Sequence, residues 1–385
     1  LIARYKGAGE REKANKVLRQ ALLLTFVLSL TASIIGYIFA EPRVKFMGAA
    51  DGETMGGIDH ETLAAGTIYL KIQMVGFVFM ALTSTITAAL RGIGDSETAM
   101  VYNLTANLVN VVLNYLLIYG KFGFPRLEVA GASLATIIGQ FVAFVMALRA
   151  ISRKGEYLEL DISEGFRPNW NILRNIFNIG IPAMVEQLVM RAGVIIYSKT
   201  VASLGTVAFA THQVSMNIQA MSFMNGQAFS VSATSLVGQS LGKKRPDMSN
   251  AYAQRTRRIG MTVSLILATT FFFFGRYIVA LYTTEAEVIE QGAQILKLVA
   301  FIQPFQSSQF ILTGALRGAG DTRATAVIIF ITVLLVRPGM AILSINHLGW
   351  GLIGAWIALV SDQLLRSLLV LIRYNSGKWK SAILQ

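Results

Sequence analysis

The strings Leu90-Arg-Gly-Ile-Gly-Asp95 and Leu316-Arg-Gly-Ala-Gly-Asp321 are nearly identical and lie 226 positions apart (316 minus 90). Each copy follows a long apolar run, and the stretches around the two copies match in hydropathy. A second pair of strings has the same order, because Gly131-Ala-Ser-Leu-Ala135 parallels Gly354-Ala-Trp-Ile-Ala358. The chain is therefore an internal duplication, and its two halves are expected to fold alike.

The composition indicates a membrane protein, since 54% of the 385 residues are hydrophobic and only 14% are charged. An apolar run of about 20 residues is long enough to cross a bilayer as an α-helix. The charge-free run 200–242 is too long for one span, so its ends are expected to be loop or helix extension. We predict an all-α integral membrane protein with ten spanning helices, which lie near 21–40, 72–90, 98–120, 129–148, 176–200, within 200–242, and near 259–275, 298–316, 322–345 and 351–372.

Lysine and arginine are unevenly distributed over the predicted loops. With the first segment in the cytoplasm, alternate loops hold 24 of the 34 Lys and Arg residues, and the opposite loops hold six. Those opposite loops also hold nine acids, among them Asp51, Glu53 and Asp59. This positive-inside bias predicts a multi-pass protein of a cell membrane, a bacterial plasma membrane, with the C-terminus in the cytoplasm. It also accounts for the net charge of +13 without a nucleic-acid partner.

The duplication predicts two pseudo-symmetric helical lobes of the same orientation, as in transporters with parallel repeats. We expect residues 1–150 to form the N-terminal lobe, 151–170 a cytoplasmic linker and 171–385 the C-terminal lobe. Two apolar helices precede Leu236, whereas none precedes the parallel position Leu1. The repeat therefore predicts a twelve-helix protein with about ten helices present here and roughly 60 to 70 residues ahead of Leu1. A chain that starts at Leu1 is expected to show no active transport.

Several strings resemble the multidrug and toxic compound extrusion (MATE) family. They are Asn110-Val-Val-Leu-Asn114, Gly180-Ile-Pro-Ala183, Ala210-Thr-His-Gln213 and the two Leu-Arg-Gly-x-Gly-Asp strings. The resemblance implies two lobes of six helices and a secondary active antiporter that works by alternating access. It would export bulky organic, often cationic, compounds such as drugs in exchange for Na⁺ or H⁺, with no cofactor besides that coupling ion. We expect a monomer that contacts the lipid bilayer.

Two other functions are weaker. A lipid-linked saccharide flippase of the same wider superfamily is the alternative, but flippases usually line the cavity with several basic residues, and only Arg191 and Arg337 qualify here. An enzyme is not expected, because the chain has no nucleophile–base set. A metal site is not expected either, because the chain has no cysteine and three histidines.

Polar and ionisable side chains inside a span are costly, so each one is a candidate site residue. The candidates for binding the substrate or the coupling ion are Asn110, Asn114, Gln140, Glu186, Gln187, Arg191, His212, Gln213, Asn217, Gln306, Arg337 and Asp362.

Glu186 lies near the middle of its predicted helix, one turn after Pro182. A carboxylate there binds a proton, Na⁺ or a cationic drug, or else it forms an ion pair with Arg191 or with a neighbouring helix. Arg191 is five residues away, about 140° round a helix, and is a poor intrahelical partner. Members of the family often carry this glutamate a turn deeper, where the present chain has Met190.

Asn110 and Asn114 are one turn apart and lie on one helix face. The family often has Asp at the second position, and Asn coordinates a cation but cannot release a proton. The alternative is a hydrogen-bonded pair between helices. His212 is expected to be a hydrogen-bonding core residue rather than a proton carrier.

Asp362 and Arg366 are spaced i, i+4, which predicts a local ion pair. Arg337 is expected to pair with Asp362 or to contact an anionic or lipid head group. In the repeated string, the glycines predict a helix end. Asp95 and Asp321 are expected to cap the next helix.

Overall fold

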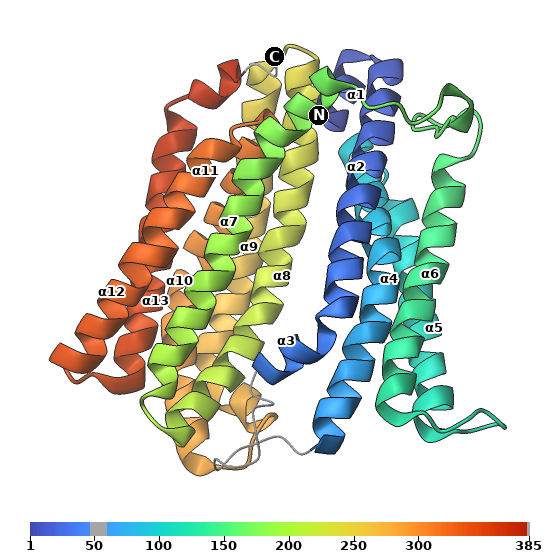
Figure 1. Cartoon of the computed structure of the whole chain (residues 1–385). Coiled ribbons are helices and arrows are strands. Elements are labelled where there is room, and N and C mark those ends of the chain that lie inside the picture. The colour runs from blue at the N-terminus through green and yellow to red at the C-terminus, as the bar shows by residue number, and fades with distance from the viewer. Residues whose placement is uncertain (47–59, 383–385) are drawn as a thin grey trace. The chain divides into compact units, whose positions relative to one another are not determined.

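The computed structural model describes residues 1–46 and 60–382. The predicted outer loop with Asp51, Glu53 and Asp59 lies outside the described residues. Every regular element in the described part is a helix, so the predicted all-α class is confirmed (Figure 1).

The chain divides into two compact units. The N-terminal unit comprises Ile2 and Arg4–Leu173, and the C-terminal unit comprises Arg174–Gln385 with Leu1 and Ala3. Before the boundary lie α1 (Ile2–Ala8), α2 (Arg11–Ile38), α3 (Ala40–Phe46), α4 (His60–Ile93), α5 (Ser96–Tyr119), α6 (Glu128–Ile151) and η1 (Ile162–Glu164). The boundary falls within α7 (Trp170–Ala202). After it lie α8 (Thr206–Gly242), α9 (Pro246–Ala280), α10 (Ala286–Ala319), α11 (Thr322–Ile329), η2 (Phe330–Val336), α12 (Arg337–Ile342), η3 (Leu343–His347), α13 (Gly351–Asn375) and η4 (Lys378–Ser381).

Nine helices of the described part are long and apolar enough to span a membrane. The tenth predicted span is α8, which is more polar and continues for 37 residues without a break. At 1.5 Å per residue it is about 55 Å long, well above the hydrocarbon thickness of about 30 Å. The long charge-free run is therefore a short turn followed by one extended helix.

The repeated string ends a helix in both units. Gly94 and Gly320 have φ of +91° and +89°, a left-handed conformation that glycine adopts without steric cost. The Asp95 carboxylate accepts a hydrogen bond from the Thr98 N–H at 3.1 Å, so the predicted cap of α5 is confirmed.

The cap predicted for the second copy is wrong. Asp321 makes no side-chain cap bond to α11 and instead accepts a hydrogen bond from Arg373 Nε of α13 at 2.8 Å. The guanidinium donor carries a positive charge opposite the carboxylate, whereas the backbone N–H of a cap is neutral.

Gly318 of the second copy and Gly314, four residues before it, set the close packing of α10 against α8. A Cβ at Gly314 would lie 2.3 Å from the Ser230 carbonyl oxygen, and one at Gly318 would lie 2.3 Å from that of Thr234. The Thr234 hydroxyl donates to the Gly314 carbonyl at 2.8 Å. Small residues four apart let two helix backbones approach in this way. Helices α8, α9 and α10 run alongside one another in the C-terminal unit (Figure 1).

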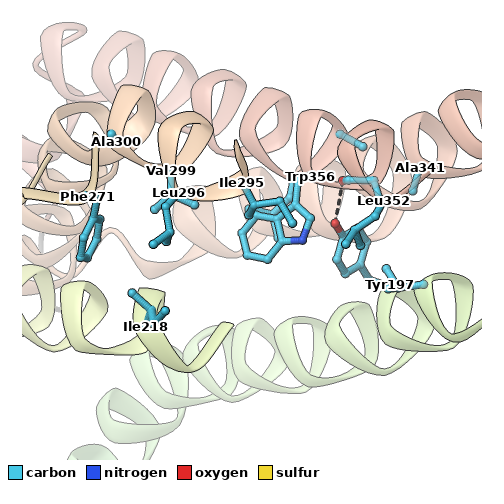
Figure 2. Close-up of a cluster of buried hydrophobic side chains, with 14 of the residues drawn as sticks. Tyr197, Ile218, Phe271, Ile295, Leu296, Val299, Ala300, Ala341, Leu352 and Trp356 are labelled. Carbon is cyan, nitrogen blue, oxygen red and sulfur yellow. Dashed lines mark hydrogen bonds between the residues drawn. The ribbon is translucent and has the colours of Figure 1, made fainter. Parts of the chain in front are cut away.

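The largest hydrophobic cluster of the C-terminal unit surrounds Trp356, which is fully buried. Figure 2 shows its indole among side chains that include Ile295 and Leu352. Next to it the Tyr197 hydroxyl donates to the Ala355 carbonyl at 2.6 Å, which ties α7 to α13.

The segment between α6 and α7 is fixed to α2 within the N-terminal unit. Arg11 contacts the Glu159 carboxylate at 2.9 Å. The Gln20 side chain donates to the Arg167 carbonyl at 2.7 Å and accepts from the Asn169 N–H at 3.0 Å. The predicted linker is thus held by side chains of a spanning helix rather than by its own secondary structure.

Trp379, just beyond α13, folds back into the C-terminal unit and is fully buried. Its ring stacks on Tyr374 at 5.0 Å, and its Nε1 donates to the Tyr374 carbonyl at 2.8 Å. Replacing Trp379 by Ala removes this packing, so we expect a loss of about 3–5 kcal/mol of unfolding free energy. Thermal unfolding of the purified full-length protein measures it. Lys378→Ala, an exposed neighbour, is the control. Equal midpoints for the two variants would contradict the assignment.

Candidate substrate and ion site

A cavity of about 780 Å³ opens in the N-terminal unit between α4, α5 and α6. Its walls combine methionines with amide and hydroxyl side chains. Methionine is flexible and polarisable, and it adapts to ligands of different shape. The lining residues are Met80, Thr83, Ser84, Thr87, Ala88, Arg91, Ser96, Met100, Asn103, Leu104, Ala106, Asn107, Asn110, Thr136, Gly139, Gln140 and Ala143.

The predicted candidates Asn110 and Gln140 line this cavity, and Asn114 is hydrogen-bonded to Asn110 one turn away on α5. Asn114 Nδ2 donates to Asn110 Oδ1 at 2.9 Å, and Asn110 Nδ2 donates to the Thr136 hydroxyl of α6 at 3.2 Å. The alternative prediction was a hydrogen-bonded pair between helices. The Asn110–Thr136 bond does join two helices, whereas the Asn114–Asn110 bond lies within α5. Asn114 Oδ1 and Gln140 Oε1 are buried and accept no hydrogen bond from the described residues. Buried acceptors are normally hydrogen-bonded, so water, a cation or a ligand donor is expected at these two oxygens.

Arg91 is the one ionisable residue among those that line the cavity, and it is exposed. Its counterpart in the second half, Arg317, has an acidic partner. The two copies of the string therefore carry arginines in different surroundings among the residues that the structure describes.

Glu186 is buried in the C-terminal unit and held from two sides. Arg317 Nη2 contacts its Oε1, and the Thr325 hydroxyl donates to its Oε2 at 3.1 Å. The expected partner on a neighbouring helix is thus found, and Arg191 is not that partner. The Arg317 side chain is 34% exposed, so this ion pair is within reach of water.

A second group of charges is completely buried. Asp362 Oδ2 accepts from Arg337 Nε at 2.8 Å and from Arg366 Nη2 at 2.7 Å. The predicted i, i+4 ion pair and the predicted Arg337–Asp362 pair are both present. Arg366 Nε also donates to the Thr332 hydroxyl at 3.2 Å. Two guanidinium groups therefore share this one carboxylate.

The backbone around Arg337 is unusual. The span that carries it has two π-helical stretches, η2 before it and η3 a turn beyond it. Wide π turns interrupt α-helices most often at functional sites. Pro338 follows directly and removes one backbone donor. The distorted helix turns Arg337 inward onto Asp362 and over the Tyr197 ring, 5.9 Å from its centroid.

His212 does not fit its prediction as a hydrogen-bonding core residue. It is buried, but its Nδ1 has no hydrogen-bond partner among the described residues. Its ring lies 5.5 Å from that of Tyr197 and 5.6 Å from that of Trp356. Aromatic packing therefore replaces the expected hydrogen bonds, because the neighbouring spans bring rings rather than acceptors to this position.

Amide side chains accumulate where α8 and α10 meet. The Ser222 hydroxyl donates to Gln303 Oε1. Both polar atoms of Gln219 and both of Gln306 are buried without a partner among the described residues. We call this group of amide side chains between α8 and α10 the amide seam. A buried unsatisfied group costs about 1–3 kcal/mol, so water or an ion is expected to form hydrogen bonds with the amide seam.

The remaining candidates are exposed on two helices of the C-terminal unit. Gln187 and Arg191 lie one turn apart on α7, and Gln213 and Asn217 lie one turn apart on α8. Met221, one turn after Asn217 on the same face of α8, is 67% exposed. These four residues contact neither the amide seam nor the Asp362 group through any hydrogen bond or ion pair of the described residues.

Sequence reasoning missed the partners that hold the candidates. Thr136 and Thr325 are ordinary residues of spans and carry no signal by themselves. Arg317 belongs to the repeated string, which predicts a helix end and does not indicate Glu186 as a partner. Gln303 could have been found, because it lies one turn before Gln306 on the same helix.

These features belong to a known family. A model of the MatE family matches residues 1–116 and 182–343, which is more than half of the chain. The chain belongs to the MatE family. Both copies of the repeated turn and the α7 stretch that carries Glu186 lie in the matched parts or at their edges.

Individual MatE relatives agree over most of the chain. The probable multidrug resistance protein NorM of Thermotoga maritima is 31% identical over 85% of this chain and 70% of its own length. The multidrug resistance protein MdtK of Yersinia pestis is 26% identical over 97% of this chain and 80% of its own. A crystal structure of MATE in the bent conformation has the same fold, with a TM-score of 0.88, 20% identity, and coverage of 99% and 83%. The integral-membrane MATE fold expected from the sequence is confirmed.

Proposed function

We propose that this MatE protein is a secondary active antiporter that exports bulky organic compounds in exchange for Na⁺ or H⁺. The cavity in the N-terminal unit carries the proposal. Its volume of about 780 Å³ lies within the range of pockets that enclose drug-sized ligands, about 300–1,000 Å³. Its mixture of methionine and amide side chains suits ligands of varied shape. Relatives named as multidrug resistance proteins support export as the direction.

For the coupling ion we propose Glu186 as the acid among the described residues of the spans. Asp362 is held by two buried arginines, whereas Glu186 has one guanidinium partner that is partly exposed. A proton or Na⁺ that reaches Glu186 competes with Arg317 for the carboxylate. Release of Arg317 then loosens the contact between α7 and α10, which gives ion binding a conformational consequence.

Transport of a lipid-linked saccharide is less well supported. A pyrophosphate needs several basic groups in the cavity. The sequence offered Arg191 and Arg337, and Arg337 already forms an ion pair with Asp362.

We also propose that the protein is a monomer of the bacterial plasma membrane, with the segment between α6 and α7 and the C-terminus in the cytoplasm.

Ethidium efflux from loaded cells that express the full-length protein tests the proposal. We expect efflux that depends on a Na⁺ or proton gradient and stops when an ionophore collapses that gradient. Gln140→Leu removes an unpaired amide from the cavity and is expected to slow efflux several-fold. Ser152→Ala, at the end of the same helix and outside the cavity lining, is the control and should not. Efflux that is indifferent to every gradient would refute antiport.

A further inference from the structure

Helix α9 presents an exposed apolar face long enough to cross the hydrocarbon of a bilayer. Ile259, Ile266 and Phe273 are 51%, 64% and 69% exposed, and the face continues to Tyr277. Ile259 and Tyr277 are 18 positions apart, which corresponds to about 27 Å at 1.5 Å per residue, close to the hydrocarbon thickness of about 30 Å. Ile259 therefore marks one boundary between hydrocarbon and head groups.

Two arginines lie immediately outside this boundary. Arg255 and Arg258 are exposed and three residues apart, so their side chains emerge from the same region of the helix. Tyr252, one turn before Arg255, is 37% exposed. Tyrosine and arginine are typical of the membrane–water interface.

The other arginines of this region have polar partners. At the start of α9, Arg245 contacts Asp247 at 2.8 Å. In the helix, Arg257 donates to the Ser308 hydroxyl at 2.7 Å. At the opposite end of the apolar face, Arg276 lies 3.7 Å from Glu290.

Arg255 and Arg258, in contrast, have no acidic partner among the described residues. One end of the apolar face thus carries two uncompensated cations, while the other end carries a neutralised one.

We propose that Arg255 and Arg258 bind the phosphate of an anionic phospholipid whose acyl chains lie along the exposed face that begins at Ile259. Guanidinium groups hold phosphate through paired N–H donors, so two of them one turn apart form a clamp for a single head group. The apolar face supplies the second half of the site, which a free anion cannot use. The proposal depends on α9 spanning the membrane and is independent of the transported substrate.

Native mass spectrometry of the full-length protein from vesicles of phosphatidylcholine with phosphatidylglycerol tests the site. We expect retained phosphatidylglycerol on the wild type. The double variant Arg255→Gln/Arg258→Gln is expected to bind it about 30-fold more weakly, because each basic residue at an anionic surface contributes about fivefold. Both side chains are exposed, so the variant should fold, and its thermal midpoint checks this.

Arg276→Gln is the matched control, since it removes one arginine from the opposite end of the same helix, and it should retain the lipid as the wild type does. Equal retention by the double variant would overturn the proposal. So would displacement of the lipid by millimolar inorganic phosphate, because the site would then recognise a free anion rather than a phospholipid. Loss of lipid from Arg276→Gln to the same extent would also overturn it, since binding would follow total charge.

Discussion

Replacing Asp362 by Asn is expected to deplete the folded protein in the membrane. Arg337 and Arg366 both bind the Asp362 carboxylate, and all three side chains are at least 94% buried. Removing one member of a buried ion pair typically costs about 3–5 kcal/mol, because the remaining charge has no water to solvate it. Here the substitution leaves two such cations. The amount of inserted full-length protein and its thermal midpoint measure the loss.

Replacing Arg337, Asp362 and Arg366 together by apolar residues shows whether the three charges are needed for folding or for transport. Buried ion groups can often be exchanged for apolar side chains of similar volume at little cost. We therefore expect Arg337→Met, Asp362→Leu and Arg366→Met together to restore insertion. If efflux also returns, the group is structural. Normal insertion and an unchanged midpoint for Asp362→Asn alone would show that the arginines have another counter-charge.

Replacing Glu186 by Gln is expected to abolish ion-coupled efflux while most of the protein still inserts. The amide keeps the shape of the carboxylate and can accept a hydrogen bond from Thr325, but it cannot exchange a proton or hold Na⁺ by charge. Arg317 loses its counter-charge, yet its side chain is 34% exposed and water can solvate it. The stability loss is therefore expected to be smaller than for Asp362→Asn. Ethidium efflux, normalised to the amount of inserted protein, gives the result.

Two further variants distinguish a coupling acid from a stabilising ion pair. Arg317→Gln breaks the same pair but keeps the carboxylate, so gradient-dependent efflux should persist. Glu186→Asp keeps the acid and should retain part of the activity. Equal efflux by Glu186→Gln and the wild type would exclude Glu186 as the coupling acid, and equal losses in Glu186→Gln and Arg317→Gln would assign the pair to stability.

The spanning helices could be predicted from the sequence because a bilayer imposes their length. The repeated string predicted matching helix ends, and Gly94 and Gly320 confirm them. Short-range contacts were also predictable: the spacing of Asp362 and Arg366 predicts their ion pair, which a single helix can form alone.

Contacts between distant residues were not predictable in the same way. Glu186 of α7 and Arg317 of α10 are 131 residues apart, and only the tertiary fold brings their side chains together. His212 looked like a hydrogen-bonding residue because its neighbours in the sequence are polar, whereas Tyr197 and Trp356 surround it in space. The polar residues of α8 did not reveal which face of the helix is buried, because its buried and exposed faces both carry amide side chains.

Ion movement in proteoliposomes tests the central claim of antiport most directly. The purified full-length protein is sealed into vesicles, an organic substrate such as ethidium is placed on one side, and Na⁺ and proton fluxes are recorded on the other. Antiport predicts that substrate movement drives one of these ions in the opposite direction, and that reversing the ion gradient reverses the substrate flux. Substrate that equilibrates at the same rate with and without a gradient, with no ion movement, would contradict the proposed function.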